Sequence, residues 1–378
     1  MKTSIAAADI LRELVAIPTP SPVSNVPLLE WVGAFLEPRG WRVHVMTYVD
    51  PAGIQKANLL ARPAASDMDA PIGLAFICHV DTVPYAATWA DALLLREVDG
   101  HLHGCGSCDV KGALACFLAA VSSLDVGALA SNAALLLTAD EEIGCKGMER
   151  LLAEHTFRIQ SAIVSEPTSL RPGIAGKGYG LARIRVEGRE AHSAFPERGV
   201  SAIAVAAQII VRIQDRFAGG WDAATSDSLF DPPRTTVNIG VIEGGTAKNI
   251  IAGHCTFLVE WRAVPGESPE YFLGELRSLL EEARRDEPRV VLHLEPMRAE
   301  AGFSPAASGP LLQRMASLLP GQPVGISFGS EASRVARIAK EVIVIGPGDM
   351  QTAHSDRECV PIAELELWTE TLRQLLQD

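Results

Sequence analysis

Residues 72–84 read IGLAFICHVDTVP, an apolar run that ends in a histidine and an aspartate. The run from Ile72 to Cys78 predicts a buried β-strand of a parallel sheet. His79 and Asp81 follow directly and stand two residues apart, so both side chains emerge on one side of the chain. Open α/β sheets place their binding sites where strands end. This stretch therefore predicts a strand of the central sheet and a site at its carboxyl end.

The segments around this strand repeat the alternation of apolar strands and helices. An apolar helix is expected at 112–124, between two buried strands. Such a βαβ pattern predicts an α/β fold with a mixed, mainly parallel sheet flanked by helices. The remaining expected strands are 42–49, 133–138, 162–165 and 342–345, and the remaining helices are 9–16, 27–39, 311–319, 332–338 and 363–376.

The order of elements changes between Lys177 and Glu295. Strands are expected at 181–186, 235–242, 255–261 and 290–294, and helices at 200–216 and 269–284. This βαββαβ order predicts a compact α+β, ferredoxin-like unit. A chain of 378 residues favours two or three domains at roughly 150 residues each. We predict two: a discontinuous first domain at 1–176 and 298–378, and an inserted domain at 177–297.

Bulk properties exclude several kinds of partner. A net charge of -13 disfavours binding to nucleic acid or to an anionic membrane. No apolar run reaches the length of a signal sequence or the roughly 18 residues of a membrane helix. The seven scattered cysteines favour reduced thiols over a disulfide framework. These features predict a cytoplasmic protein that acts on a small molecule.

Other polar residues also follow predicted strands or turns. The glycine-rich stretch GCGSCDVKG, 104–112, presents Asp109 just before an apolar helix, and DEEIG, 140–144, follows a strand. Glu166 and His354 come after two further strands. Each alone has a structural explanation, such as a helix cap for Asp109 or an acidic loop for Glu166.

Together these residues indicate a metal site. The carboxylates expected at the sheet ends would repel one another without cations, and two divalent ions would nearly balance them. Two histidines combined with carboxylates suit zinc, with cobalt or manganese as substitutes. The carboxylates are Asp81, Asp109, Glu141, Glu142 and Glu166.

The motifs resemble those of the co-catalytic zinc metallopeptidases, which include acetylornithine deacetylase, succinyl-diaminopimelate desuccinylase, aminoacylase and a glutamate-releasing carboxypeptidase. The resemblance covers nearly the whole chain. It rests on HVDTVP at His79, GCGSCDVKG ending at Gly112, DEEIG at Asp140, EPT at Glu166 and AH at His354. It implies a zinc-peptidase-like catalytic domain with an inserted lid domain.

The resemblance also implies the ligands. One metal would be bound by His79, Asp109 and Glu166, and the other by Glu142, Asp109 and His354. Asp109 would bridge the two ions, and a cis peptide is expected between Asp109 and Val110.

Catalytic roles follow from the same resemblance. Asp81 would orient His79, and Glu141 would act as the general base. His192 on the lid would supply a further donor to the reacting carbonyl, in some relatives from the second subunit of a homodimer.

Four residues are expected to bind the substrate. Arg262 suits bidentate pairing with a carboxylate, and Asn249 resembles a lid residue of the family. Gly348 would shape the pocket wall, and Glu331 would receive a cationic side chain. The structural alternatives are a surface ion pair for Arg262, turn chemistry for Asn249 and a helix N-terminal role for Glu331.

The expected reaction is hydrolysis of the amide bond of an N-acyl amino acid. The ending GPGDMQTAHSDRE resembles the acetylornithine deacetylase branch, which implies N-acetylornithine, in arginine biosynthesis, or a close compound such as N-acetylcitrulline. The alternatives are a desuccinylase, a dipeptidase or carboxypeptidase, and a non-enzymatic metal-binding scaffold. Cys105 and Cys108 also form a CxxC pair, which leaves a structural zinc site or a redox role open.

Overall fold

Residues 5–125, 129–130, 132–217, 227–304 and 309–377 are described by a computed structural model, in which the chain divides into two units. Unit 1 comprises Met1–Ile174, Pro305–Val324 and Ser330–Asp378, and unit 2 comprises Ala175–Ser304 and Gly325–Gly329. The chain thus leaves unit 1, forms most of unit 2 and returns. Gly325–Gly329 lies with unit 2, although the sequence assigns this stretch to the first domain.

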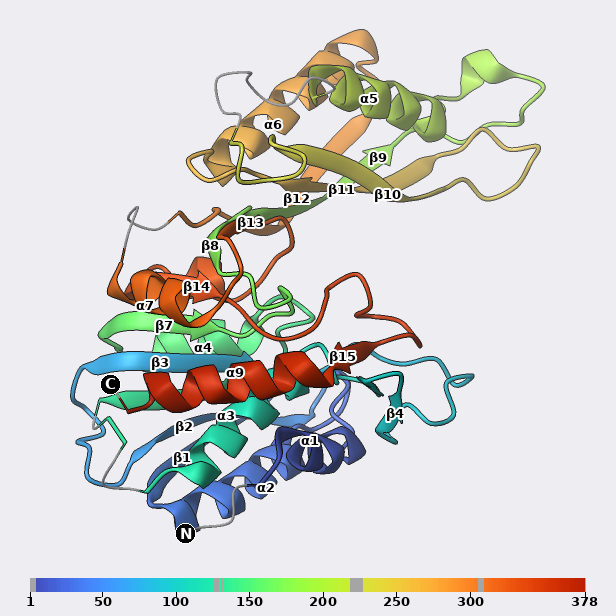
Figure 1. Cartoon of the computed structure of the whole chain (residues 1–378). Helices are drawn as coiled ribbons and strands as arrows, with labels where there is room; N and C mark the ends of the chain where they lie inside the picture. Colours follow the sequence, from blue (N-terminus) through green and yellow to red (C-terminus); the bar gives the residue numbers. More distant parts are fainter. Residues whose placement is uncertain (1–4, 126–128, 131, 218–226, 305–308, 378) are drawn as a thin grey trace. The chain divides into compact units, whose positions relative to one another are not determined.

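An eight-stranded sheet forms the centre of unit 1, in the order β1-β2-β6-β3-β7-β14-β8-β13 (Figure 1). Its central pairs, β6 with β3, β3 with β7 and β7 with β14, are parallel. The pairs β1 with β2, β2 with β6 and β14 with β8 are antiparallel. The strands are β1 (Trp41–Val49), β2 (Gln55–Pro63), β3 (Ile72–His79), β6 (Ala133–Thr138), β7 (Ile159–Val164), β8 (Gly173–Gly176), β13 (Val324–Ile326) and β14 (Ala339–Val344).

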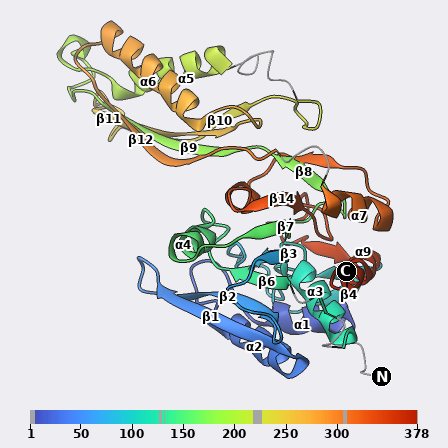
Figure 2. The same cartoon turned by 90° about the vertical axis from the view of Figure 1, so that its left-hand side faces the viewer.

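Helices cover both faces of this sheet. One hydrophobic cluster joins one face to α1 (Ala7–Ala16), α2 (Val26–Leu36), α3 (Lys111–Ser123), α7 (Pro310–Leu318) and α9 (Ile362–Leu375). The opposite face carries α4 (Lys146–Glu154), as Figure 2 shows. Every residue of α3 from Lys111 to Ser122 is buried, because α1 and α9 pack against it as well as the sheet. This explains why its sequence is apolar on all sides.

A second, three-stranded sheet in unit 1 joins distant parts of the chain. It has the order β15-β5-β4, formed by β15 (Cys359–Pro361), β5 (His101–His103) and β4 (Arg96–Val98). Cys359 pairs with His103 in antiparallel register. The pairing brings the segment after His354 beside the glycine-rich stretch before Asp109.

Unit 2 contains the predicted βαββαβ order, with a four-stranded antiparallel sheet in the order β10-β11-β9-β12. Its core includes Trp261, which stacks on Phe272 of α6 at 4.2 Å between ring centroids. Gly180 lies against that indole, since a Cβ there would stand 1.7 Å from Trp261 Cε2. The elements are β9 (Tyr179–Glu187), α5 (Ala202–Phe217), β10 (Thr236–Gly244), β11 (His254–Arg262), α6 (Pro269–Asp286) and β12 (Val291–Glu300).

Several elements differ from the sequence expectations. Strand β2 and helix α4 were not predicted, and α8 (Ala332–Val335) is shorter than the helix expected at 332–338. The short strands of the second sheet were also missed. Among the described residues, no helix is both long and apolar enough to span a bilayer.

Candidate metal centre and active site

His79 is the last residue of β3 and lies buried near the middle of the large sheet. Its Nδ1 is 3.0 Å from the main-chain oxygen of Asp81 and 3.6 Å from Asp81 Oδ1. The main chain of Asp81 is therefore the nearer partner, whereas the sequence suggested its carboxylate. A hydrogen bond at Nδ1 leaves Nε2 free to face a metal.

The carboxylate of Asp81 holds the turn that carries Glu141 and Glu142. Its Oδ1 accepts from the amide of Glu141 at 3.0 Å, and its Oδ2 accepts from the amide of Glu142 at 3.2 Å. The hydroxyl of Ser21 donates to Oδ2 at 2.8 Å. Asp81 thus links two strand ends, that of β3 and that of β6.

Asp109 precedes α3, and its side chain lies between two histidines. Its Oδ1 is 3.1 Å from His79 Nε2, and its Oδ2 is 3.1 Å from His354 Nε2. Each oxygen thus faces a different histidine, as a bridging ligand requires. The peptide bond between Asp109 and Val110 is cis, as the resemblance implied.

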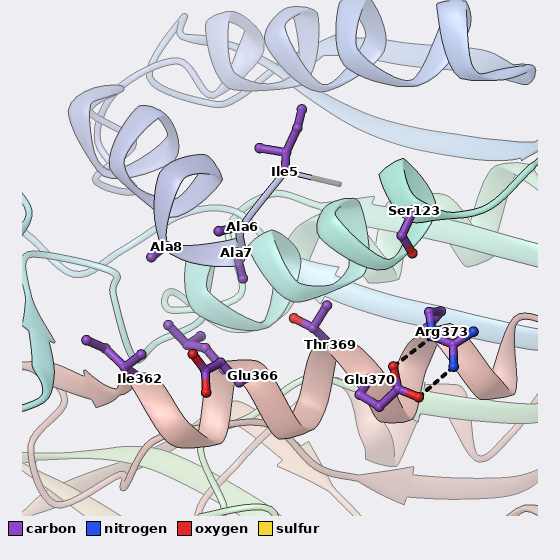
Figure 3. A pocket seen from close by; sticks show the side chains of 11 residues that line it. Ile5, Ala6, Ala7, Ala8, Ser123, Ile362, Glu366, Thr369, Glu370 and Arg373 are labelled. Atoms are coloured by element: carbon purple, nitrogen blue, oxygen red, sulfur yellow. Dashed lines mark hydrogen bonds and ion pairs between the residues drawn. The ribbon is translucent and has the colours of Figure 1, made fainter. Parts of the chain in front are cut away.

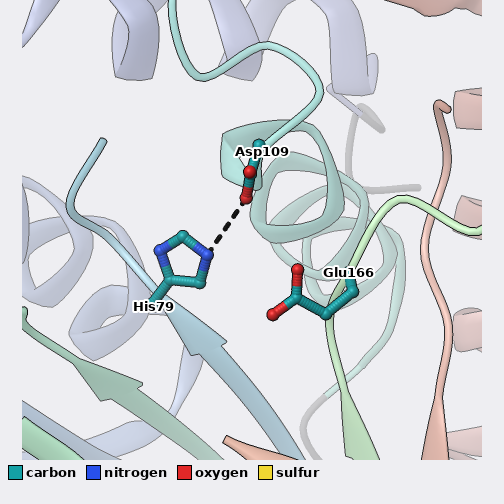
Figure 4. Close-up of side chains that lie close together, drawn as sticks. All are labelled: His79, Asp109 and Glu166. Atoms are coloured by element: carbon teal, nitrogen blue, oxygen red, sulfur yellow. Dashed lines mark hydrogen bonds and ion pairs between the residues drawn. The ribbon is translucent and has the colours of Figure 1, made fainter. Parts of the chain in front are cut away.

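Two groups of potential ligands share Asp109. His79, Asp109 and Glu166 form the inner group, in which the three side chains point toward one another (Figure 4). Asp109, Glu142 and His354 form the outer group, in which His354 Nε2 lies 3.1 Å from Glu142 Oε2. Within each group the ligand atoms lie within 4.8 Å of one another. The side chain of His79 is 2% exposed and that of His354 is 49% exposed.

The electrostatics of the site indicate a need for positive charge. Burial raises the pKa of Glu166 well above its usual range, and the nearby charges of Asp109 and Glu141 raise it further. Hydrogen bonds to Asp109 and Glu142 raise the pKa of His354 to about 10. Both shifts favour the protonated forms, as expected where several acids converge without a balancing positive charge.

The residues present fit two metal ions. Glu142 Oε1 is buried and has no hydrogen-bond partner in the part of the chain that the structure describes. A buried carboxylate oxygen without a partner is costly, and a cation in the outer group would satisfy it. Imidazole nitrogens and carboxylate oxygens are the ligands that zinc accepts.

Glu141 lies beside the ligands and belongs to neither group. Burial is the main cause that raises its pKa to about 8, and the neighbouring acid Glu142 adds to the shift. The thiol of Cys145 donates to Glu141 Oε1 at 3.2 Å. A carboxylate that is held near the metal ligands without coordinating is placed to accept a proton there.

Two predicted substrate-binding residues lie in unit 1. Glu331 is buried and accepts from the hydroxyl of Thr138 at 2.9 Å, while its Oε1 is among the buried oxygens without a partner in the described structure. Burial raises its pKa to about 7. Gly348 has a φ of +93° and lies against Cys108, since a Cβ there would be 2.5 Å from the sulfur. Glycine is required at that position.

Three predicted residues lie in unit 2. His192 is exposed, and the amide of Ala194 donates to its Nδ1 at 3.1 Å, which fixes the proton of a neutral ring on Nε2. Asn249 is its neighbour, because the carbonyl of Asn249 accepts from the amide of Ser193 at 3.0 Å. An exposed Nε2–H next to an exposed amide is a suitable pair of donors for a substrate.

Arg262 is held by two contacts inside unit 2. Its guanidinium stacks on Tyr179 at 3.8 Å from the ring centroid. Its Nε and a terminal nitrogen donate to Glu260 Oε1 at 2.8 and 2.6 Å. These contacts orient the planar group and leave its other terminal nitrogen free of Glu260.

Sequence reasoning missed several residues that support the ligands. Lys56 forms a buried ion pair with Asp140 at 2.8 Å, directly before Glu141. Glu358 is buried and accepts hydrogen bonds from the loop that carries Asp109. Both look like ordinary surface charges in sequence. The available signal in the sequence is position, since Asp140 directly precedes Glu141 and Glu358 follows His354 by four residues.

The cysteines of the CxxC pair are free thiols, as are the other five. The thiol of Cys108 lies 3.5 Å from the carbonyl of Asp349, and burial raises its pKa well above the usual range. Neither cysteine belongs to a ligand group in the described part of the chain.

A separate hollow of about 280 Å³ lies between α1, the end of α3 and α9 (Figure 3). Ile5, Leu365 and Glu366 are among its lining residues. None of the predicted site residues lines it, so it is distinct from the ligand groups.

Comparisons with known proteins show the family of the chain. Residues 174–288 match the family model of the M20 peptidase dimerisation domain. The acetylornithine deacetylase of Myxococcus xanthus is 41% identical over 355 residues, which cover 94% of this chain and 92% of that enzyme.

Solved structures share the fold. A tripeptidase from Staphylococcus aureus superposes with a TM-score of 0.79 at 20% identity, covering 100% of this chain and 98% of the other. An M20 family metallo-carboxypeptidase from Sulfolobus solfataricus gives 0.75 at 17% identity and covers 98% of both chains.

Proposed function

The chain belongs to the M20 family of peptidases, and from this premise we propose that it deacetylates N-acetylornithine in a metal-dependent reaction. The observation that carries the reaction class is the pair of ligand groups that share Asp109, with Glu141 beside them. The substrate rests on the similarity to the acetylornithine deacetylase of Myxococcus xanthus.

We assign two zinc ions to the ligand groups, with cobalt or manganese as substitutes. His79, Asp109 and Glu166 would hold one ion, and Asp109, Glu142 and His354 the other. When bound, such ions lower the pKa of water toward about 7 and polarise a carbonyl. Asp81 holds both His79 and the turn that carries Glu141 in the positions that two bound ions would require.

Glu141 moves the proton in the proposed reaction. Its carboxylate accepts a proton from the attacking water, and it returns that proton to the nitrogen of the leaving amine. The raised pKa of Glu141 in the metal-free site reflects burial first, and nearby cations would lower it. The amide of Glu141 donates to Asp81, so a fixed turn positions the Glu141 carboxylate.

Unit 2 is proposed to act as a lid that supplies substrate donors. The Nε2–H of His192 would stabilise the oxyanion that forms on the carbonyl, and Asn249 would donate beside it. Arg262 would pair with the substrate carboxylate through its fixed guanidinium plane. Gly348 would form a pocket wall, and Glu331 would balance a cationic side chain.

Assembly and location are part of the same proposal. The match to a dimerisation domain supports a homodimer formed through unit 2. We propose a cytoplasmic enzyme of arginine biosynthesis, consistent with the free cysteines.

A hydrolysis panel tests the function. Purified protein is assayed with N-acetylornithine, N-acetylcitrulline, succinyl-diaminopimelate and dipeptides, before chelation, after chelation and after the return of Zn²⁺. We expect preference for N-acetylornithine, loss of activity on chelation and recovery with zinc. Full activity after complete metal removal would refute the mechanism, and preference for a dipeptide would refute only the substrate.

A further inference from the structure

Glu358 is a buried carboxylate near the outer ligand group. It follows His354 by four residues and is 2% exposed. It forms no ion pair with a lysine, arginine or histidine in the described ranges. Burying an ionisable group without a counterion is unfavourable unless hydrogen bonds replace its hydration.

The hydrogen bonds to Glu358 all come from one loop. Its Oε1 accepts from the amides of Cys108 and Asp109, both at 3.0 Å, and its Oε2 accepts from the amide of Gly106 at 2.9 Å. In return, its main-chain oxygen accepts from the amide of Gly104 at 3.3 Å. One residue therefore fixes the main chain on both sides of Ser107, up to the proposed bridging ligand itself.

The same residue is tied to the other side of the outer group. The amide of Glu358 donates to the carbonyl of Ser355 at 3.1 Å, which closes the turn that follows His354. The next residue, Cys359, begins β15, whose pairing with β5 anchors the turn. Glu358 thus connects the Asp109 loop to the His354 turn, although the two are about 250 residues apart.

We propose that Glu358 is a positioning residue that sets the Asp109 loop in its metal-binding conformation before any metal arrives. The inference rests on the proposed role of Asp109 as the bridging ligand. A carboxyl group with two acceptor oxygens suits three converging N–H donors. A glutamine replaces one of these oxygens with an NH₂ group, which would face at least one of the main-chain N–H groups, donor against donor. The bridging carboxylate then loses its fixed direction.

The main test compares Glu358→Gln with wild type by the affinity for Zn²⁺ alone, measured by competition with a chromophoric chelator. We expect the dissociation constant to rise about 10- to 100-fold, as for other groups that orient metal ligands. The visible spectrum of the Co²⁺ form should change as well. Glu366→Gln is the matched control, because Glu366 lines the hollow between α1, α3 and α9 and should leave both readouts unchanged (Figure 3).

The outcomes separate the two proposals. Wild-type protein that fails to bind two Zn²⁺ would refute the metal centre. If wild type binds two Zn²⁺ and Glu358→Gln binds them as tightly, only the positioning role is refuted. That conclusion holds whether or not the melting temperature of the metal-free variant changes. Glu358→Asp should lie between wild type and Glu358→Gln, because it keeps the charge and shortens the reach.

A measurement on wild type keeps the inference testable if these variants do not fold. In metal-free protein, the amides of Gly106, Cys108 and Asp109 should exchange with deuterium slowly, because each is already hydrogen-bonded. Exchange as fast as in an exposed loop would overturn the proposal.

Discussion

The two units present their candidate functional residues in opposite ways. In unit 1, residues from five separate stretches of the chain converge at the sheet, and most of their polar atoms face one another. In unit 2, His192 and Asn249 are exposed, and the hydrogen bonds described for them join their two neighbouring loops. The difference teaches that unit 1 is organised to bind ions by itself. The donors of unit 2 remain exposed, and in the proposed function their partner is the substrate.

This comparison predicts that substitutions in the two units have different effects. Changes in unit 1 should alter metal binding, chemistry or both, whereas changes in unit 2 should alter turnover and leave the metals in place. In the proposed function, the residues of unit 2 act through contacts with the substrate and not with the metals.

The largest effect is expected for Glu141→Gln. The variant keeps the size of the side chain and removes the base, so kcat should fall about 10²- to 10⁴-fold. Both metals should remain, since Glu141 belongs to neither ligand group. Steady-state kinetics and elemental analysis of the same sample provide the check. Turnover close to wild type would exclude Glu141 as the base.

His192→Ala should have the next largest effect. Loss of one donor to an oxyanion typically lowers kcat about 10²- to 10³-fold. Metal content and melting temperature should not change, because the ring is exposed and its contacts are local. His192→Gln, which retains a donor, serves as the matched variant. A loss of zinc in His192→Ala would contradict the separation of the two units.

Arg262→Lys should produce a smaller effect that appears mainly in KM. Lysine keeps the charge but loses the planar fork and the stacking on Tyr179, so KM should rise about 10-fold. The substrate dependence of the initial rate measures this directly. A substrate analogue without its carboxylate should show no difference between the variant and wild type; a difference of the same size would argue against the pairing.

The smallest effect concerns how the stability of the metal-free protein depends on pH. Burial, as the main cause, raises the pKa of Glu141 from 4.5 to about 8 and those of Glu331 and Glu358 to about 7. Between pH 4.5 and 8 the native state therefore binds more protons than the unfolded state, and stability falls as pH rises through this window.

The melting temperature of chelated protein, recorded from pH 5 to pH 8, checks this dependence. It should drop by roughly 1 °C for each kcal/mol lost, because the unfolding entropy of a 378-residue chain is large. Restoring Zn²⁺ should flatten the curve, because the ions then stabilise the ionised acids. An increase with pH in the chelated protein would contradict the proposed cause.

The fold was predictable where apolar residues fill whole strands. Strand β3 and its terminal His79 are readable for that reason, as are β6 and the fully buried helix α3. Strand β2 was missed because Lys56, Asn58 and Arg62 interrupt its apolar pattern, yet all three are buried. The partners of Lys56 and Asn58, which include Asp140 and Gly147, lie far away in sequence, whereas Arg62 donates to main-chain oxygens of the loop that follows it.

The candidate site was predictable to a different extent. Spacing alone left Asp109 as either a cap or a ligand, and the resemblance assigned its role. Side-chain partners could not be predicted, because they depend on register between distant segments. Glu358 is the clearest case: in sequence it ends the polar run Ser355 to Glu358, and only the pairing of β15 with β5 brings it to the Asp109 loop.

The position of the insertion bears on the order of assembly during protein synthesis. His79, Asp109 and Glu166 all leave the ribosome before unit 2 begins at Ala175, whereas Glu358, which holds the Asp109 loop, is made after it. The outer group also needs His354, which is made only after unit 2 is complete. A prematurely terminated chain that lacks the final segment therefore loses one candidate ligand of the outer group together with the contacts that hold the Asp109 loop.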